Sequence, residues 1–188
     1  MLLVVVFLGM AWLGFAGPGG GVQTPPLRIV PPGEVQTCSV RALFVSPARD
    51  YVIEQAVAAA LDAARESILI AMFSLSDREL MEAVIRAHLR GVRVRVLLDG
   101  GAGQGCGPWA RLLACGIPVL VEQAPGLMHH KFVVIDRRVV ITGSYDWTEE
   151  ANERNCENVV IIDCPGIARA FAGEFERLWA LLRAGRIP

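Results

Sequence analysis

Hydrophobic and polar residues follow two patterns along this chain, and the two patterns predict different elements. Apolar runs of about four to eight residues are typical of strands, whereas apolar residues at helical spacing predict helices that pack by one face. The predicted strands are Val40–Val45, Ser67–Phe73, Val92–Leu98, Ile117–Glu122, Phe132–Ile135, Val139–Ile141 and Asn158–Asp163. The predicted helices are Tyr51–Ala64, Arg78–Arg90, Trp109–Cys115 and Ile167–Arg183.

Strands that alternate with helices are typical of an α/β fold, with a mixed β-sheet sandwiched between helices. Ser67–Phe73 is apolar almost throughout, as expected of a strand buried on both faces. Either Ser76 or Asp77 is expected to cap the second helix, and Gly91 to end it. No internal repeat is found, so we expect one domain, at residues 39–188.

An apolar segment, residues 1–17, precedes this domain. Leu2–Ala16 carries no charge, and the small residues Gly14 and Ala16 resemble a signal-peptidase site. The run is shorter than the roughly 18–20 residues of a comfortable membrane span. We expect a cleaved export signal, with a retained membrane anchor or a misplaced start as alternatives. Residues 18–38 are expected to be a linker, and the protein to be periplasmic or secreted, or anchored to the membrane by its N-terminus.

Composition and charge limit the partners. Hydrophobic residues make up 53% of the chain, which predicts a substantial core and excludes a disordered protein. The net charge of −1 gives no global attraction to nucleic acid or to an anionic membrane. Any nucleic-acid partner must therefore be held by a local group of arginines.

The five cysteines leave at least one thiol unpaired within the chain. Cys156 and Cys164 flank a predicted strand about 26 Å long, which is far beyond disulfide reach. Cys106 and Cys115 can bridge a loop only where the segment between them is not fully helical. No Cys-x-x-Cys pair is present, and no zinc site is expected.

The stretch Met128–Thr148 concentrates the polar chemistry of the chain, and two apolar runs on either side of a basic turn predict a β-hairpin there. Side chains alternate along a strand, so His129 and Lys131 are expected on the same side. Lys131 is the only lysine among eighteen basic residues. An imidazole beside an ammonium group suits chemistry on an anionic group such as a phosphate.

Other features near this hairpin have structural interpretations. His130 is expected to face away from the site, and His88 to be a surface residue near a helix end. The glycine-rich stretch Asp99–Gly107 lacks the Gly-Lys-Ser/Thr ending of a phosphate-binding loop, which favours a mobile loop near the site. The acidic residues between 149 and 153 are expected to be a solvated segment.

His129-x-Lys131 with Asp136 five residues beyond, followed by Gly143-Ser144, resembles the HxKxxxxD and GSxN motifs of the phospholipase D superfamily. The resemblance extends over residues 40–182. Within the superfamily, the chain most resembles the small single-motif members, namely the bacterial endonucleases and the mitochondrial cardiolipin hydrolase group. It implies a phospholipase D-like domain with one motif per chain. Because most members place two motifs face to face, it also implies a homodimer with the active site at the twofold interface. No metal and no other cofactor is implied.

The resemblance assigns a role to each matching residue. His129 would attack phosphorus and form a phosphohistidine, and His129 of a second copy would protonate the leaving alcohol and then activate water. Lys131 and Ser144 would bind the phosphate oxygens. Glu157 matches the downstream acid that orients the catalytic imidazole. Asp136 ends the catalytic motif, and we interpret it as a brace of the hairpin and the dimer region.

Asp146 departs from the motif, because the family has an asparagine at this phosphate-binding position. A carboxylate cannot donate a hydrogen bond to phosphate unless it is protonated. Asp146 is therefore expected to face elsewhere, to have a raised pKa, or to mark a weakened activity.

Three functions follow from these observations. The first is a metal-independent phosphodiester hydrolase that acts as a non-specific endonuclease on DNA or RNA. The second is a phospholipase D that removes phospholipid head groups, with possible membrane association through the N-terminus. The third, motivated by Asp146, is a non-catalytic phosphate-binding module.

Overall fold

A mixed sheet with the strand order β1-β7-β6-β5-β2-β3-β4 forms the centre of the fold. The computed structural model describes residues 38–46, 51–101, 109–122 and 128–185. The strands are β1 (Ser39–Val45), β2 (Ser67–Met72), β3 (Arg93–Asp99), β4 (Val119–Glu122), β5 (Lys131–Ile135), β6 (Val139–Gly143) and β7 (Glu157–Asp163). The helices are α1 (Val52–Ala63), α2 (Arg78–Leu89), α3 (Ala110–Ala114), α4 (Glu149–Glu153) and α5 (Pro165–Arg183).

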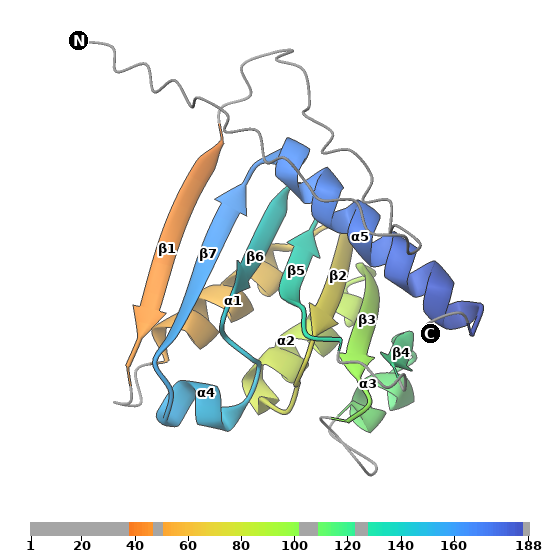
Figure 1. Cartoon of the computed structure of the whole chain (residues 1–188), viewed down its shortest axis with the longest axis horizontal. Helices are drawn as coiled ribbons and strands as arrows, with labels where there is room; N and C mark the ends of the chain where they lie inside the picture. The colour runs from red at the N-terminus through yellow and green to blue at the C-terminus, as the bar shows by residue number, and fades with distance from the viewer. Residues whose placement is uncertain (1–37, 47–50, 102–108, 123–127, 186–188) are drawn as a thin grey trace, which may run out of the picture. The chain divides into compact units, whose positions relative to one another are not determined.

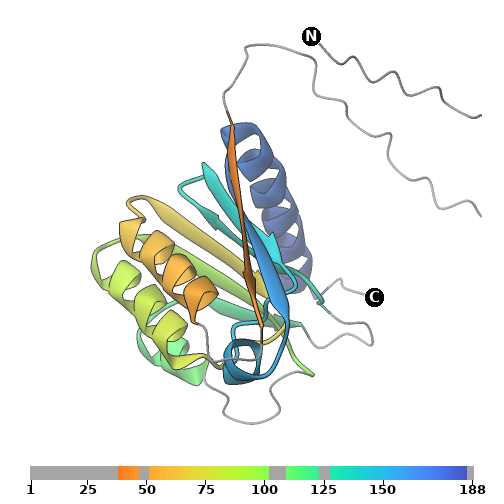
Figure 2. The same ribbon diagram turned by 90° about the vertical axis from the view of Figure 1, so that its left-hand side faces the viewer.

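Helices cover both faces of the sheet, so the predicted sandwich is confirmed. Helices α1 and α2 lie on one face and α5 lies on the other (Figures 1 and 2). Along β2, Ile68 and Ile70 belong to the core beneath α1 and α2, whereas Leu69 and Ala71 belong to the core beneath α5. This alternation explains why β2 is apolar at nearly every position.

Strand β2 is central because it joins the two halves of the sheet. It pairs parallel with β3 and antiparallel with β5, and Met72 lies opposite Lys131 in the β2–β5 register. Strands β5, β6 and β7 are antiparallel to one another. As a result, one end of the sheet, the lower end in Figure 1, contains the end of β2, the start of β5, the end of β6 and the start of β7.

The opposite end of the β2–β5 pair is held by Asp136. Its carboxylate accepts hydrogen bonds from the backbone N–H groups of Arg65, Glu66 and Ser67 at 3.0, 2.8 and 2.9 Å. Asp136 and Arg137 both have φ near 51°, which is the left-handed conformation that a tight hairpin turn requires. Asp136 therefore braces the hairpin against the start of β2, as we interpreted it from the sequence.

Helix boundaries follow local signals. The side chain of Asp77, the second of the two predicted caps, accepts a hydrogen bond from the Leu80 N–H at 2.8 Å. Gly91 follows α2 with φ of +92°. The acidic segment is exposed at Glu149 and Glu150, as expected, and it also forms α4. This helix begins where the Thr148 hydroxyl accepts a hydrogen bond from the Ala151 N–H at 3.2 Å.

Two expectations from the sequence concern residues outside the described ranges. These are the apolar segment at 1–17 with most of the linker at 18–38, and residues 102–108 of the glycine-rich stretch. Among the helices that the structure describes, none combines the length and the apolar character needed to cross a membrane.

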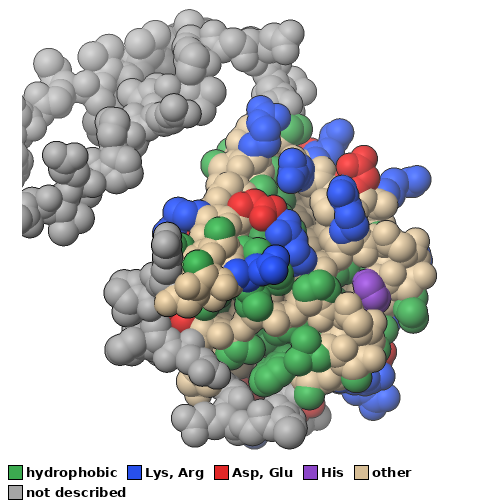
Figure 3. Space-filling model, turned by 90° about the vertical axis from the view of Figure 1, so that its right-hand side faces the viewer, with side chains coloured by type: hydrophobic (Ala, Val, Ile, Leu, Met, Phe, Trp, Pro, Cys, Tyr) green, Lys and Arg blue, Asp and Glu red, His purple; other side chains and the backbone are tan. Residues whose placement is uncertain are grey.

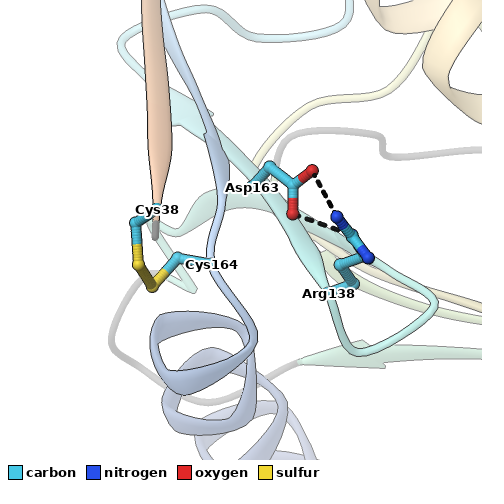
Figure 4. Close-up of a disulfide and its surroundings, with 4 residues drawn as sticks. All are labelled: Cys38, Arg138, Asp163 and Cys164. Carbon is cyan, nitrogen blue, oxygen red and sulfur yellow. Dashed lines mark hydrogen bonds and ion pairs between the residues drawn. A yellow bond between two sulfur atoms is a disulfide. The ribbon is translucent and has the colours of Figure 1, made fainter. Parts of the chain in front are cut away.

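A disulfide joins Cys38 to Cys164, so the residue before β1 is tied to the residue after β7 (Figure 4). Beside it, the Arg138 guanidinium donates two hydrogen bonds to the Asp163 carboxylate, at 2.8 and 3.1 Å. The predicted separation of Cys156 from Cys164 is confirmed, because Cys156 is a free thiol. Cys115 is also free, so the bridge to Cys106 that the sequence allowed is not formed, and Cys106 itself lies outside the described residues.

We predict that reducing the Cys38–Cys164 disulfide lowers the free energy of unfolding. The bond closes a loop across 126 residues, and removing such a crosslink typically costs about 2–4 kcal/mol because the unfolded chain gains freedom. Thermal unfolding of the native protein with and without reductant, beside a Cys38→Ser/Cys164→Ser variant, measures the effect. Equal melting temperatures for all three samples would contradict the prediction. A Cys156→Ser variant is the control, since Cys156 has no disulfide partner.

Candidate active site

Most of the motif residues lie together at the strand ends on the lower side of the sheet in Figure 1. Lys131 begins β5 and His129 precedes it, Ser144 and Asp146 follow β6, and Glu157 begins β7. The chain enters β5 at Met128, whose N–H donates to the buried Asp99 carboxylate at 2.8 Å. Asp99 lies at the end of β3, so this hydrogen bond fixes the position of the backbone directly before His129.

His129 and Lys131 face the same side, as their spacing predicts. The Lys131 Nζ lies 3.4 Å from the His129 Nε2, and both side chains contact the ring of Phe73. The ring centroids of His129 and Phe73 are 4.8 Å apart in an edge-on arrangement. The His129 side chain is exposed, while only 11% of the Lys131 side chain is accessible. The His129 imidazole is thus open to solvent beside a largely buried cation.

Phe73 belongs to the site although its sequence pattern did not indicate it. The apolar run predicted Phe73 at the end of a buried strand, whereas β2 ends at Met72 and the Phe73 ring turns toward the site. The Phe73 ring packs against the imidazole and lies 4.8 Å from the Lys131 Nζ, which gives the ammonium a cation–π contact. The only available signal was its position directly after an apolar run.

Asp146 faces the site and pairs with Lys131, so the alternative that it faces elsewhere is wrong. Its Oδ2 lies 3.3 Å from the Lys131 Nζ, and its Oδ1 accepts a hydrogen bond from the Ser74 N–H at 3.2 Å. Burial raises the pKa of the Asp146 carboxyl above its ordinary value, and the charge of Lys131 opposes that shift. Asp146 therefore competes with any phosphate oxygen for the ammonium group of Lys131, which is the only lysine in the sequence.

Ser144 and Glu157 form a second hydrogen-bonded group at the same end of the sheet, beside the group of His129, Lys131 and Asp146. The Ser144 hydroxyl donates to a carboxylate oxygen of Glu157 and accepts a hydrogen bond from the Asn158 N–H at 3.1 Å. The other oxygen of Glu157 accepts a hydrogen bond from the Asn155 amide at 2.9 Å. Within one described chain, the structure brings Glu157 to Ser144, and it does not bring it to His129.

A glycine precedes Ser144 because two backbones approach closely there. A Cβ added at Gly143 would lie 2.0 Å from the carbonyl oxygen of Asn158. The Ser144 N–H donates to this same carbonyl at 3.1 Å. Glycine at position 143 therefore allows the contact that places the Ser144 side chain beside β7.

Asp136 lies outside this group. It follows β5 at the end opposite Lys131, about 17 Å away along the strand. Its carboxylate oxygens are occupied by the backbone N–H groups before β2. The structure thus gives Asp136 a bracing position, away from His129 and Lys131.

His130 points to the other face of the sheet, as its place in the alternation predicts. Its Nε2 lies 3.7 Å from Glu174 of α5, and its ring packs edge-on against Phe132 in the core beneath α5. Among the described residues, no group of three His, Cys, Asp or Glu side chains is arranged to hold a metal ion.

A buried polar network supports the segment that carries Ser144 and Asp146. The Tyr145 hydroxyl donates to the Asn152 side chain at 2.6 Å, and the Asn152 amide donates to Asp77 at 2.7 Å. Asp77 in turn shares a hydrogen bond with the Glu54 carboxyl, which links α1 to the network. Burial, together with the charge of Asp77, raises the pKa of Glu54 to about 7. No local sequence pattern indicated this network, because its members come from four separate segments of the chain.

Comparison with known proteins adds three findings. The family model described as "Cardiolipin synthase, PLD-like domain" matches residues 57–179. The chain is 46% identical to human mitochondrial cardiolipin hydrolase over 121 residues, which cover 64% of this chain and 48% of that protein. It is 34% identical to phospholipase D of Rickettsia felis over 150 residues, which cover 79% of this chain and 74% of that protein. The chain spans about half the length of the cardiolipin hydrolases that it matches.

Solved structures show the same fold. The crystal structure of the phospholipase D family member Nuc from Salmonella typhimurium matches with a TM-score of 0.70 and 27% identity, over 77% of this chain and 95% of that chain. NucT from Helicobacter pylori matches with a TM-score of 0.70 and 20% identity, over 77% of this chain and 97% of that chain. The second likeness is evidence for the fold alone.

We predict that the Glu54–Asp77 pair makes stability depend on pH. The pKa of Glu54 is raised from 4.5 to about 7 in the folded state, so its contribution is complete below pH 4.5 and is lost as the pH rises through about 7. The melting temperature should fall between about pH 5 and pH 8, and Glu54→Gln should flatten this slope because the amide cannot ionise. Glu150→Gln, at an exposed position of α4, is the matched control. An unchanged slope in Glu54→Gln would refute the prediction.

Proposed function

The chain belongs to the phospholipase D superfamily, and from this premise we propose that it is a metal-independent phosphodiester hydrolase that acts through a phosphohistidine on His129. The observation that carries the proposal is the exposed His129 imidazole with the Lys131 Nζ 3.4 Å away. A nucleophile and a cation at this separation can contact the phosphorus and a non-bridging oxygen of one phosphate.

In the first step, the Nε2 of neutral His129 attacks phosphorus, a nitrogen–phosphorus bond forms, and the bond to the leaving oxygen breaks. The leaving oxygen takes a proton from His129 of a second copy. In the second step, that imidazole accepts a proton from water, the water oxygen attacks phosphorus, and the nitrogen–phosphorus bond breaks. Both histidines return to their starting states, so the sum is hydrolysis of one phosphodiester bond.

Lys131 and Ser144 are proposed to stabilise the negative charge that builds on the phosphate oxygens. Removing one such donor typically costs about 2.7–4 kcal/mol of transition-state stabilisation. The Phe73 ring limits the movement of the imidazole and of Lys131. Glu157 holds the Ser144 hydroxyl, and we propose that it also contacts an imidazole once two copies meet.

A homodimer is part of the proposal because the mechanism needs two imidazoles and each chain carries one motif. The exposed side chains of His129 and Ser144 lie at the end of the sheet, where a second copy can approach along a twofold axis. Two copies would place two histidines and two lysines around one phosphate.

Nucleic acid is the proposed substrate, with non-specific endonuclease activity on DNA or RNA. The site lies at the exposed ends of interior strands of the sheet, and an exposed nucleophile can reach a phosphate within a continuous nucleic-acid strand. Phospholipid is the second candidate, since the relatives include proteins named mitochondrial cardiolipin hydrolase and phospholipase D. A non-catalytic phosphate-binding role is the third candidate, because Asp146 occupies Lys131.

Export is the proposed location, either after cleavage of residues 1–17 or with these residues as a membrane anchor. The Cys38–Cys164 disulfide supports this proposal, because disulfides persist mainly in oxidising compartments.

We predict that the purified protein hydrolyses bis-p-nitrophenyl phosphate in the presence of EDTA and that His129→Ala abolishes the activity. Loss of the nucleophile removes the covalent route, so the rate should fall by at least about a thousandfold. His130→Ala is the matched control, since it removes a neighbouring exposed histidine that lies on the other face. Activity that needs added metal, or that survives in His129→Ala, would overturn the proposal.

Substrate class is tested with the same samples. Single-stranded and double-stranded nucleic acids and cardiolipin vesicles are compared at increasing salt. Phosphate-backbone binding weakens steeply with salt, whereas lipid hydrolysis depends on the interface. Cleavage of vesicles without cleavage of nucleic acid would favour the phospholipase, and inactivity on every substrate by a folded dimer would favour the binding module.

We predict that Asp146→Asn increases kcat by about tenfold. The substitution removes a negative charge beside the negative phosphate and adds an amide donor, which together should lower the activation free energy by roughly 1.4 kcal/mol. The substitution also releases Lys131 from its ion pair at 3.3 Å. Steady-state kinetics with the same substrate measure the change, and Asp146→Ala separates loss of charge from gain of a donor. A decrease in kcat would show that the carboxylate is needed to position Lys131. An increase of several orders of magnitude would mark the native protein as a phosphate-binding remnant.

A further inference from the structure

A cavity of about 540 Å³ opens at the end of the sheet opposite His129. Its wall includes the start of β2 at Ser67, the side chains of Arg93, Arg95 and Arg137, and His88 at the end of α2. We propose that this cavity is a second anion-binding site, which takes a phosphate group in a free phosphate compound or a lipid head group.

Strand register places two of the arginines on one face. Ser67 pairs with Arg93 and Leu69 pairs with Arg95 in the parallel β2–β3 register. Arg95 is held rigidly, because its guanidinium forms two hydrogen bonds with the Glu176 carboxylate and lies 5.3 and 5.2 Å from the rings of Phe175 and Trp179. The Arg95 side chain therefore forms a fixed wall.

The third arginine reaches the cavity from a constrained turn. Arg137 has φ of 51°, a conformation that is costly for a side chain with a Cβ and that glycine or asparagine adopts more readily. Asp136 holds this turn against the start of β2 through the backbone N–H groups of Glu66 and Ser67. An arginine at such a position, in the wall of a basic cavity, suggests that its charge has a use there.

Positive charge exceeds negative charge around the cavity. Glu176 pairs directly with Arg95 and also interacts with the charge of Arg137, whereas no direct ion pair of Arg93 or Arg137 with a carboxylate is found among the described residues. Figure 3 shows basic side chains, with a few acidic ones among them, on the upper part of the face that it views. Guanidinium groups without carboxylate partners can bind a phosphate through paired N–H donors.

His88 contributes a polar side wall. It is partly exposed near the end of α2, as expected of a surface residue, and it lines the cavity wall. Gly116, with φ of +82°, lines the same wall, and a Cβ there would lie 3.9 Å from the His88 Nε2. The cavity therefore combines guanidinium groups with an imidazole, a group that can donate to a phosphate oxygen.

This site is separate from the candidate active site. Ser67 begins β2, whereas Met72 ends it opposite Lys131, so the two sites lie about 17 Å apart along the strand. One phosphate cannot contact both. The inference therefore stands or falls independently of the proposed hydrolase activity.

The test is an NMR titration of the full-length, isotope-labelled protein with inorganic phosphate. The backbone amide and Nε resonances of Arg93 and Arg137 should shift and saturate, separately from those of Ser144 at the active site. In an Arg93→Gln/Arg137→Gln variant, phosphate affinity at the remaining cavity resonances, such as that of Gly116, should fall by at least about tenfold. The shifts at Ser144 and the hydrolysis of bis-p-nitrophenyl phosphate should not change.

Arg41→Gln is the matched control, because Arg41 is an exposed arginine on the opposite edge strand β1. Arg137→Gly is a second variant that glycine's backbone freedom should leave folded, with cavity binding still reduced. Flotation with phosphatidylglycerol vesicles identifies the source: binding lost in the double variant assigns a lipid head group, and binding of free phosphate alone assigns a soluble compound. No saturable shift at Arg93 or Arg137, an equal loss in Arg41→Gln, or shifts with an oligonucleotide but not with phosphate would overturn the proposal.

Discussion

The antiparallel pairing of β2 with β5 is the constraint on which the rest of the structure depends. At one end, the Asp136 carboxylate receives backbone N–H groups that precede β2, and this fixes the hairpin turn. At the other end, the same register sets Lys131 opposite Met72. A slip of one residue would move every side chain of β5 to the other face, so His129 and Lys131 would move together to the α5 face that now carries His130. The last residue of the motif thus acts on the first two through strand register.

Lys131 is the centre of competing interactions at the site. It lies 3.3 Å from Asp146 and 3.4 Å from the His129 imidazole, with the Phe73 ring beneath it. Its largely buried side chain leaves the ammonium group few orientations, which lowers the entropic cost of meeting a phosphate. The cost is that Asp146 already neutralises it. The same contacts that order Lys131 before substrate arrives therefore also pair its charge with Asp146. The strength of this ion pair relative to a phosphate contact governs how well Lys131 can bind substrate.

The two ends of the sheet have different electrostatic character. The end with His129 combines a cation with carboxylates. At the end with Arg93 and Arg137, three guanidinium groups line the cavity, and the Glu176 carboxylate pairs directly with that of Arg95. A net charge of −1 conceals this separation, since positive and negative groups cancel in the sum. Local arrangement, more than total charge, governs where an anion is attracted.

Local patterns in the sequence determined the strands and long helices, the Asp77 cap and the common face of His129 and Lys131. These features depend on side-chain alternation and on contacts between near neighbours, which a linear pattern records. The α4 helix was missed although its Thr148 cap was visible, because acidic residues dominated the interpretation of that segment. Only the tertiary structure decided that Phe73 packs on the imidazole and that Asp146 pairs with Lys131. Phe73 and His129 are far apart in the chain, and strand order, which no local pattern encodes, brings them together. Asp146 belongs to the same predicted hairpin as Lys131, but it lies beyond the end of β6, where strand alternation no longer indicates the direction of a side chain.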